Sequence, residues 1–183
     1  MHSFPEKRDK LNRKLIEEII LKKYNQYYRL AYSYVHNEAD AGDIVQNGAY
    51  KALRNGHTLK KVEYAETWVY RIMLNECIRC VKQFRHLSYE AIQEENGTEA
   101  GYKEDDYENI DLQRALDALQ DRDKAIIILR YFEDKKLEEI AEILEENVNT
   151  IKSRLYRSIK KMRAALSDEP GSNEQTLSSE TGR

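Results

Sequence analysis

The chain has few of the residues that interrupt helices or cross-link a fold. Its 183 residues include seven glycines, two prolines and two cysteines. So few turn-forming residues argue against an all-β protein, which needs a turn between successive strands. Charged residues make up 34% of the chain and hydrophobic residues 40%, a composition typical of a helix-rich protein. We therefore expect an all-α fold.

Other absences narrow the classes of function. No apolar run approaches the ~20 residues that span a bilayer. The charged segment 1–14 also lacks the apolar core of a signal peptide. We therefore expect a cytoplasmic protein without membrane insertion. Four scattered histidines, no nucleophile motif and no phosphate-binding glycine loop argue against an enzyme.

Both cysteines belong to one CxxC pair within an amphipathic helical pattern. Cys77 and Cys80 fall on the same face as Val69 and Met73. A zinc site would need a second such pair or nearby histidines, and His86 falls on the opposite face. We therefore favour core packing over metal or redox chemistry, and we expect no metal and no cofactor.

Residues 10–87 predict a first helical domain. A long helix is expected from Asp9 to a break at 36–38. A second helix is expected from Asp40 to about Leu53, and a third from about Tyr64 to Phe84. The third helix has Phe84 on its apolar face.

The composition changes sharply after this domain. Residues 88–110 are strongly acidic and contain breakers such as Asn96-Gly97, which predicts a flexible linker. Residues 111–166 predict a second domain of four short helices. Residues 167–183 have no apolar periodicity, and we expect them to be disordered.

The last expected helix is strongly basic. Residues 150–166 hold six basic residues and no acid, although the formal net charge of the chain is −3. Arg154, Arg157 and Lys161 lie opposite an apolar sector, so we expect them to face water or an anion. The preceding segment 137–144 has the pattern of a short core-facing helix, and the pair predicts a helix-turn-helix. The competing interpretation is a solvated amphipathic helix packed on a bundle.

The third helix of the first domain has a basic stripe opposite its apolar face. An aromatic residue at the start of such a stripe can stack on an unpaired base, while cations follow phosphates. A tryptophan at a helix start can equally anchor the core, and the sequence leaves both interpretations open. The stripe consists of Trp68, Arg71, Asn75, Arg79 and Lys82.

These segments in this order resemble the extracytoplasmic-function sigma factors, two-domain promoter-recognition subunits of bacterial RNA polymerase. Residues 27–32 and 40–46 resemble the polymerase-binding segment of the family, and 68–75 resemble its helix for the minus-ten element. The likeness covers roughly residues 20–86 and 111–166. In the second domain, segments 129–133, 140–144 and 150–157 resemble the part that recognises the minus-thirty-five element.

The resemblance implies an alternative sigma factor that binds core RNA polymerase and promoter DNA. Members of this family are commonly held inactive by an anti-sigma factor, so such a protein is a possible further partner. The basic stripe and the loop 55–66 would contact the minus-ten element as the duplex opens. Asn149 would be the N-cap of the recognition helix, with Thr150 its first residue. Asp40, Asp43, Gln46 and Asn47 would bind polymerase, and Asn149, Thr150, Lys152, Ser153, Arg154, Arg157 and Lys161 would bind the minus-thirty-five element.

The sequence departs from the family pattern in three places. Gly42 stands where an acid is usual, and Asn47-Gly48 replaces an acidic and a small residue. Glu145-Glu146 replaces the glycine and apolar residue of the helix-turn-helix turn. Because a left-handed turn position disfavours side chains, either the turn differs, with Val148 supplying the apolar contact, or the recognition helix is reoriented.

Two alternatives stay open at this point. A stand-alone helix-turn-helix regulator would bind DNA without polymerase, but it leaves the Trp68 stripe without a purpose. The acidic linker could mimic nucleic acid in a basic channel of the polymerase, or could serve only as a solubilising spacer.

Overall fold

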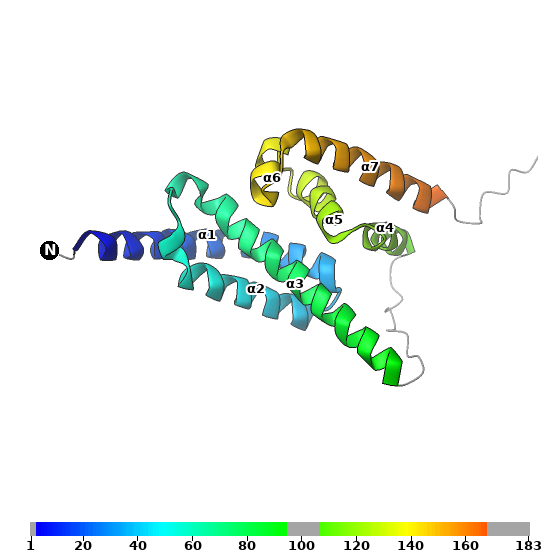
Figure 1. Ribbon diagram of the computed structural model, residues 1–183, viewed down its shortest axis with the longest axis horizontal. Coiled ribbons are helices and arrows are strands. Elements are labelled where there is room, and N and C mark those ends of the chain that lie inside the picture. The colour runs from blue at the N-terminus through cyan, green and yellow to red at the C-terminus, as the bar shows by residue number, and fades with distance from the viewer. Residues whose placement is uncertain (1–2, 95–106, 168–183) are drawn as a thin grey trace, which may run out of the picture.

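The computed structural model describes residues 3–94 and 107–167, and every regular element in these two ranges is helical (Figure 1). The prediction of an all-α fold with two helical domains is confirmed. None of the described helices is long and apolar enough to cross a membrane. The elements are α1 (Ser3–Val35), α2 (Glu38–Arg54), the 3-10 turns η1 (Gly56–Thr58) and η2 (Val62–Tyr64), α3 (Ala65–Glu94), α4 (Tyr107–Asp117), α5 (Asp121–Ile127), the π-turn η3 (Ile128–Phe132), α6 (Leu137–Leu144) and α7 (Val148–Ser167).

Helices α1, α2 and α3 pack together as the first domain. The break between α1 and α2 lies where the sequence predicts it, with His36 in a left-handed conformation (φ 53°). Asn37 then caps α2, since its side chain accepts a hydrogen bond from the Asp40 N–H at 3.0 Å. The predicted start at Asp40 is therefore wrong by two residues, because α2 begins at Glu38.

Helix α3 is longer than predicted and continues to Glu94, into the segment expected to be linker. Its C-terminal end projects past the bundle (Figure 1), and Phe84 is 44% exposed. The expectation that Phe84 packs in the core is therefore wrong, because this side chain lies beyond the part of α3 that is packed between the other helices. The rest of the expected linker up to residue 106, and the expected disordered tail from residue 168, lie outside the described residues.

The second domain consists of α4, α5 with η3, α6 and α7, in agreement with the four predicted helices. Its own apolar centre joins α4 and α5 to the middle of α7. This cluster contains Leu116, Leu119 and Ile127, with Leu112, Leu155, Ile159 and Met162 packed against them.

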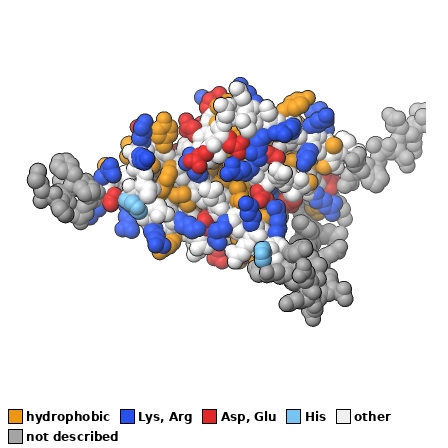
Figure 2. Space-filling view, in the orientation of Figure 1, with side chains coloured by type: hydrophobic (Ala, Val, Ile, Leu, Met, Phe, Trp, Pro, Cys, Tyr) orange, Lys and Arg blue, Asp and Glu red, His pale blue; other side chains and the backbone are white. Residues whose placement is uncertain are grey.

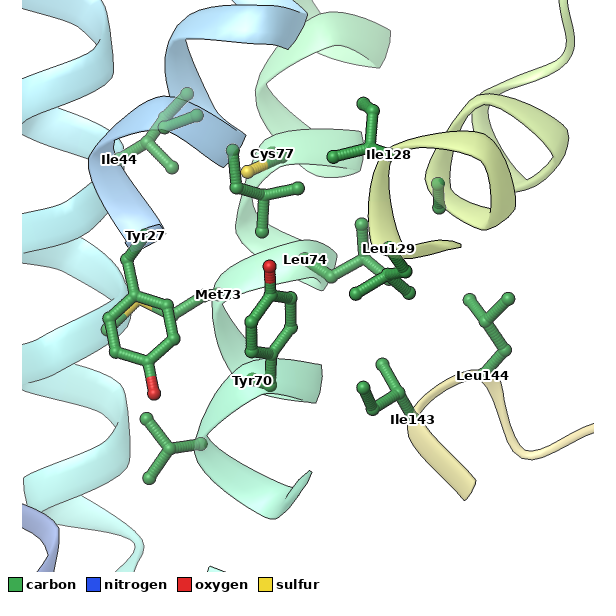
Figure 3. Close-up of a cluster of buried hydrophobic side chains, with 14 of the residues drawn as sticks. Tyr27, Ile44, Tyr70, Met73, Leu74, Cys77, Ile128, Leu129, Ile143 and Leu144 are labelled. Atoms are coloured by element: carbon green, nitrogen blue, oxygen red, sulfur yellow. The ribbon is translucent and has the colours of Figure 1, made fainter. Parts of the chain in front are cut away.

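The two domains pack against each other through a shared core (Figure 3). Tyr70 and Leu74 of α3 belong to the same buried cluster as Leu129 of η3 and Ile143 of α6. Each of these side chains is almost completely buried. The domains predicted from the sequence are thus one packed body in this conformation.

Two glycines in α2 occupy opposite environments, which gives a testable prediction on stability. A Cβ at Gly48 would lie 2.3 Å from the sulfur of Met73, whereas a Cβ at Gly42 would meet nothing within 4 Å. Gly42→Ala should therefore raise the free energy of unfolding by about 0.5–1 kcal/mol through helix propensity. Gly48→Ala should lower it by about 1–3 kcal/mol, because buried Met73 must move.

Urea denaturation followed by circular dichroism measures both effects. The two variants are matched, since each adds one methyl group to the same helix. Equal changes in both would show that α2 does not approach α3 at Gly48.

Candidate nucleic-acid interface

A hollow of about 580 Å³ lies beside Trp68, at the start of the predicted basic stripe. Its floor comes from the loop before α3 and from the first turns of α3. Asn12 of α1 is buried and fixes this loop, since its side-chain amide donates to the carbonyl oxygens of Gly56 (3.0 Å) and Leu59 (3.2 Å). Thr58, Leu59, Lys60, Lys61, Tyr64, Thr67, Trp68 and Arg71 line the hollow, together with Glu142 and Glu145 of the second domain.

Trp68 is partly buried and packs against the shared core while also lining the hollow. The structure thus supports the core-anchor interpretation for the packed part of the side chain, and stacking on an unpaired base stays a prediction. Tyr64, 45% exposed, and the cation of Lys61, 5.7 Å from the centre of the Tyr64 ring, lie at the same hollow. Aromatic faces beside cations are the groups that hold an unstacked nucleotide.

Arg71 was expected to face solvent on the basic stripe, but it contacts the second domain instead. Its guanidinium donates to the carbonyl oxygens of Glu142 (2.5 Å) and Ile143 (3.1 Å), and it pairs with the Glu145 carboxylate at 2.5 Å. These oxygens belong to the C-terminal end of α6 and the turn after it. The sequence could not predict this contact, because the partners lie more than 70 positions away.

The remainder of the stripe stays on the surface. Asn75, Arg79 and Lys82 are exposed along α3. Arg79 donates to Glu76 at 3.0 Å, and Lys51 of α2 also pairs with Glu76, which is 4% exposed. Burial alone would raise the pKa of Glu76, but the hydrogen bonds from Lys51 and Arg79 outweigh it and lower the pKa. Glu76 therefore stays ionised and holds Arg79 against α3.

Helix α7 presents an exposed polar face over its first three turns, as predicted. Its N-terminus differs from the prediction, because α7 begins at Val148 and the Asn147 side chain accepts from the Asn149 N–H at 2.8 Å. Asn149 is thus the second helical residue rather than the N-cap. The exposed predicted residues are Asn149, Thr150, Lys152, Ser153, Arg157 and Lys161.

Arg154 is the exception on α7, because the anions that it faces are two carboxylates of the chain itself. Its side chain is only 16% exposed and donates to Asp123 of α5 at 2.7 Å and to Glu146 at 2.7 Å. Burial would lower the pKa of the guanidinium, but these two carboxylates raise it. Arg154 therefore holds α7 against α5 and the turn.

The helix-turn-helix turn keeps a left-handed residue without a glycine. Glu145 takes this conformation (φ 55°, ψ 42°), which is disfavoured for a residue with a side chain. The Glu146 N–H donates to the Ala141 carbonyl at 3.0 Å and closes the end of α6. Val148 packs against the shared core, so it supplies the expected apolar contact.

The proposed polymerase-binding residues lie on α2. Asp43, Gln46 and Asn47 are exposed on one face, whereas Asp40 is only partly exposed. Tyr50, 63% exposed, extends this face by one turn and was not among the residues predicted from the sequence.

Tyr156 of α7 was missed in the same way and is 73% exposed, between Ser153 and Arg157 on the polar face. Both tyrosines could have been found from the sequence, because Tyr50 follows Asn47 by three positions and Tyr156 follows Ser153 by three positions, a spacing that shares one side of a helix.

The cysteines belong to the core, as predicted. Cys77 is fully buried, and burial raises the pKa of its thiol. Cys80 is partly buried and packs against the same cluster. Among the described residues, no group of histidine, cysteine or acidic side chains could hold a metal ion.

Comparisons with known proteins agree with this arrangement. Residues 19–86 match the family described as Sigma-70 region 2, and residues 109–162 match Sigma-70 region 4. The RNA polymerase sigma factor SigV of Bacillus subtilis (strain 168) is 44% identical over 166 residues, which cover 89% of this chain and 98% of SigV. The ECF RNA polymerase sigma factor SigW of the same organism is 29% identical, over 79% of this chain and 84% of SigW.

Two solved structures with the same fold are complexes. The sigma factor RpoE bound to the anti-sigma factor NepR from Bartonella quintana has a TM-score of 0.65 at 20% identity, covering 84% of this chain and 97% of that one. CnrH bound to the cytosolic domain of CnrY has a TM-score of 0.66 at 19% identity, covering 90% and 96%. Each helical domain matches one sigma-factor family, and SigV is similar to this chain over almost its whole length. The chain therefore belongs to the extracytoplasmic-function family of RNA polymerase sigma factors.

Proposed function

We propose that the chain binds core RNA polymerase as an alternative sigma factor and directs transcription initiation from promoters with two separated elements. The proposal rests on the Sigma-70 region 2 and region 4 matches, which fall on the two domains that hold the basic stripe and the polar face of α7. A sigma factor supplies recognition while the polymerase supplies catalysis, so we assign no catalytic residue and no cofactor. We place its action in the cytoplasm, where the template and the polymerase are found.

The first domain would hold the non-template strand of the minus-ten element. The hollow beside Trp68 combines aromatic rings with Lys60 and Lys61, which suits one unstacked base and its phosphate. Exposed Asn75, Arg79 and Lys82 continue along α3 as a track for the adjoining backbone. Arg71 would join this track once α6 leaves it.

The second domain would read the minus-thirty-five element in the major groove. Thr150, Ser153 and Arg157 lie on the exposed face near the N-terminus of α7, where a recognition helix contacts base edges. Lys161 lies one turn beyond Arg157 on this face, and Lys152 is exposed near the start of α7; both would contact phosphates. Arg154 would act through α5 rather than touch a base.

The polymerase would bind the exposed face of α2. Asp43, Gln46 and Asn47 offer acceptors and one negative charge on a single side of the helix, and Tyr50 adds an aromatic surface. An aromatic residue beside polar groups is a common composition for the centre of a protein interface.

Transcription in vitro tests this function directly. Core polymerase with the purified chain, supplied with fragmented genomic DNA, should produce transcripts whose start sites share two sequence elements at fixed spacing. The same sequences also identify the promoter. Transcripts no more abundant than with core polymerase alone would contradict the proposal.

Trp68→Ala should impair duplex opening more than the first binding of the duplex. The loss of one stacking face is expected to cost about 1–3 kcal/mol, or roughly 5- to 150-fold in the open complex. Permanganate reactivity of unpaired thymines measures opening, and gel mobility at low temperature measures initial binding.

Phe84→Ala is the control for this test, since Phe84 is an exposed aromatic residue further along α3. It should behave like the unchanged chain in both measurements. Wild-type permanganate reactivity in Trp68→Ala would show that Trp68 serves the core alone.

The stand-alone regulator is not favoured. The family match to region 2 accounts for the first domain, which such a regulator leaves without a purpose. An anti-sigma factor remains part of the proposal, because structures of the same fold contain sigma factors with such partners.

A further inference from the structure

A second hollow, of about 490 Å³, lies where the C-terminal end of α1 meets α4 and η3, and we call it the α4 hollow. It is separate from the hollow beside Trp68, since the two have no lining residue in common. Its volume falls within the range of cavities that hold small organic ligands. The residues proposed above to contact DNA do not line it, so those contacts leave the α4 hollow unexplained.

The walls of the α4 hollow are mostly apolar. Leu30 and Leu116 are buried there, and the rings of Tyr28, Tyr32 and Phe132 also line it. Tyr32 is 41% exposed and Phe132 is 56% exposed, so both rings are accessible to a ligand. This lining differs from the surface that Figure 2 shows, where charged side chains surround small hydrophobic patches. It suits the apolar body of a small molecule.

The π-turn η3 brings an acid to this apolar lining. The Glu133 N–H closes the wide turn by donating to the Ile128 carbonyl at 3.1 Å. Residues four and five positions apart share one side of such a turn, so Phe132 and Glu133 line the hollow together with Ile128. Tyr131, the other exposed aromatic residue of η3, does not line it. Turns of this kind are frequent at functional sites.

Glu133 is the lining residue whose buried polar atom lacks a hydrogen-bond partner among the described residues. Its side chain is 1% exposed, and the atom without a partner is Oε2. The other oxygen, Oε1, lies 3.6 Å from the guanidinium of Arg29. Burial raises the pKa of the Glu133 carboxyl, and Arg29 and Lys135 offset this effect only in part. A cation that reached Oε2 would therefore gain a strong, charge-assisted hydrogen bond.

Two other polar residues of the lining already have partners within the chain. The Ser33 hydroxyl donates to the Leu30 carbonyl of its own helix at 2.7 Å. His36 lies 3.0 Å from the carboxylate of Asp117 and also contacts the side chain of Gln113. These groups close the side of the hollow between α1 and α4, and they leave Glu133 as the acceptor for a ligand.

The cations nearest Glu133 do not fill its free acceptor position. Lys23 and Lys135 both bind the carboxylate of Glu66, Lys135 at 3.2 Å, so part of their charge is already balanced. The side chain of Arg29 is 61% exposed and is largely solvated. The hollow thus combines accessible aromatic rings with a buried carboxylate that is incompletely paired.

We propose that the α4 hollow binds a small organic cation, an amine with an aromatic body, whose ammonium group bonds to Glu133 while the body packs against Phe132 and Tyr32. Aromatic faces attract such a cation in addition to the carboxylate. An anionic ligand would be repelled by Glu133, and a purely apolar ligand would leave Oε2 without a partner.

Isothermal titration calorimetry of the full chain with naphthylethylamine, which is protonated at neutral pH, tests the proposal. Naphthylethanol is the matched ligand, since it has the same aromatic body and a neutral hydroxyl group. The amine should bind about tenfold or more tightly than the alcohol, because only the amine forms a charged hydrogen bond. No binding of the amine, or equal binding of the two, would overturn the proposal.

Glu133→Gln tests the role of the acid, because it keeps the shape of the side chain and removes its charge. It should weaken binding of the amine about tenfold and leave binding of the alcohol unchanged. Glu138→Gln is the matched control at an exposed position of α6, and it should change neither. Thermal unfolding confirms that both variants are folded. Amine binding that is equal in the two variants would remove Glu133 from the site and overturn the proposal.

A second pair of variants locates the site and does not alter any buried residue. Phe132→Ala removes an exposed ring that lines the hollow, whereas Tyr131→Ala removes the neighbouring exposed ring that does not. Phe132→Ala should weaken binding of the amine about three- to tenfold, and Tyr131→Ala should leave it unchanged. Equal effects of the two substitutions would place the ligand elsewhere and overturn the proposal.

These results are independent of the proposed function. The ligand is titrated into the chain alone, whereas transcription is measured with core polymerase and without ligand. Active transcription with no binding of the amine would reject the ligand site alone, and binding without transcription would reject the proposed function alone.

Discussion

Arg154→Ala is expected to lower the free energy of unfolding by about 3 kcal/mol, although the residue lies on the helix predicted to bind DNA. Its guanidinium is 16% exposed and donates to Asp123 and Glu146 at 2.7 Å each. Removing one member of a largely buried charge network leaves the others desolvated and without their partner, which costs more than the pair itself contributes. Glu146 keeps a cationic partner in this variant, because Arg122 also binds it. Most of the loss in stability should therefore come from Asp123, whose bond to Arg154 is not replaced.

Urea denaturation measured by circular dichroism gives this free energy. Arg157→Ala is the matched control, one turn further along α7 at an exposed position, and it should change stability by less than about 0.5 kcal/mol. Equal stability in the two variants would mean that the network around Arg154 does not hold α7 in place.

Arg157→Ala is expected to weaken recognition of the upstream promoter element by about 1–3 kcal/mol, or roughly 5- to 150-fold, without unfolding the domain. Its side chain is exposed, and its Nε donates only at 3.4 Å, to the Ser153 carbonyl of its own helix. The guanidinium can therefore turn to a base edge at little cost. Run-off transcription from a promoter found by the genomic experiment, compared with versions mutated in the upstream element, measures the effect.

Lys161→Ala serves as the comparison for this second prediction. A lysine that contacts phosphate should weaken binding equally on all sequences and reduce its dependence on salt. Arg157→Ala should instead reduce the discrimination between the natural and mutated elements. Unchanged discrimination would remove Arg157 from the set of base-reading residues.

Arg154 and Arg157 illustrate why one sequence pattern gives two outcomes. Both are cations outside the apolar residues of α7, and charge alone predicts the same role for each. Asp123 on α5 lies within reach of the first and not of the second. Substitution should thus affect folding at one position and promoter recognition at the other.

Periodicity in the sequence was sufficient for the existence of the helices and for most of the residues on their apolar faces, with Phe84 as an exception. The helical periodicity around Cys77, with apolar neighbours at i−4 and i+3 on one face, predicted that its side chain is buried, and the structure confirms this burial. The polar face of α7 follows from the same rule, since residues three and four apart share a side of a helix. The ordered motifs then indicated the family without any knowledge of contacts.

Only the tertiary structure decided which elements cover those polar faces. Arg71 could be predicted to lie on a basic stripe, but its partners at the end of α6 depend on how the two domains pack. The lack of space for a side chain at Gly48 likewise comes from the sulfur of Met73 on α3, 25 positions away in the sequence. The physical reason is that the pitch of a helix is a local property of the chain, whereas the partner of a charge or the space beside a glycine is supplied by residues distant in sequence.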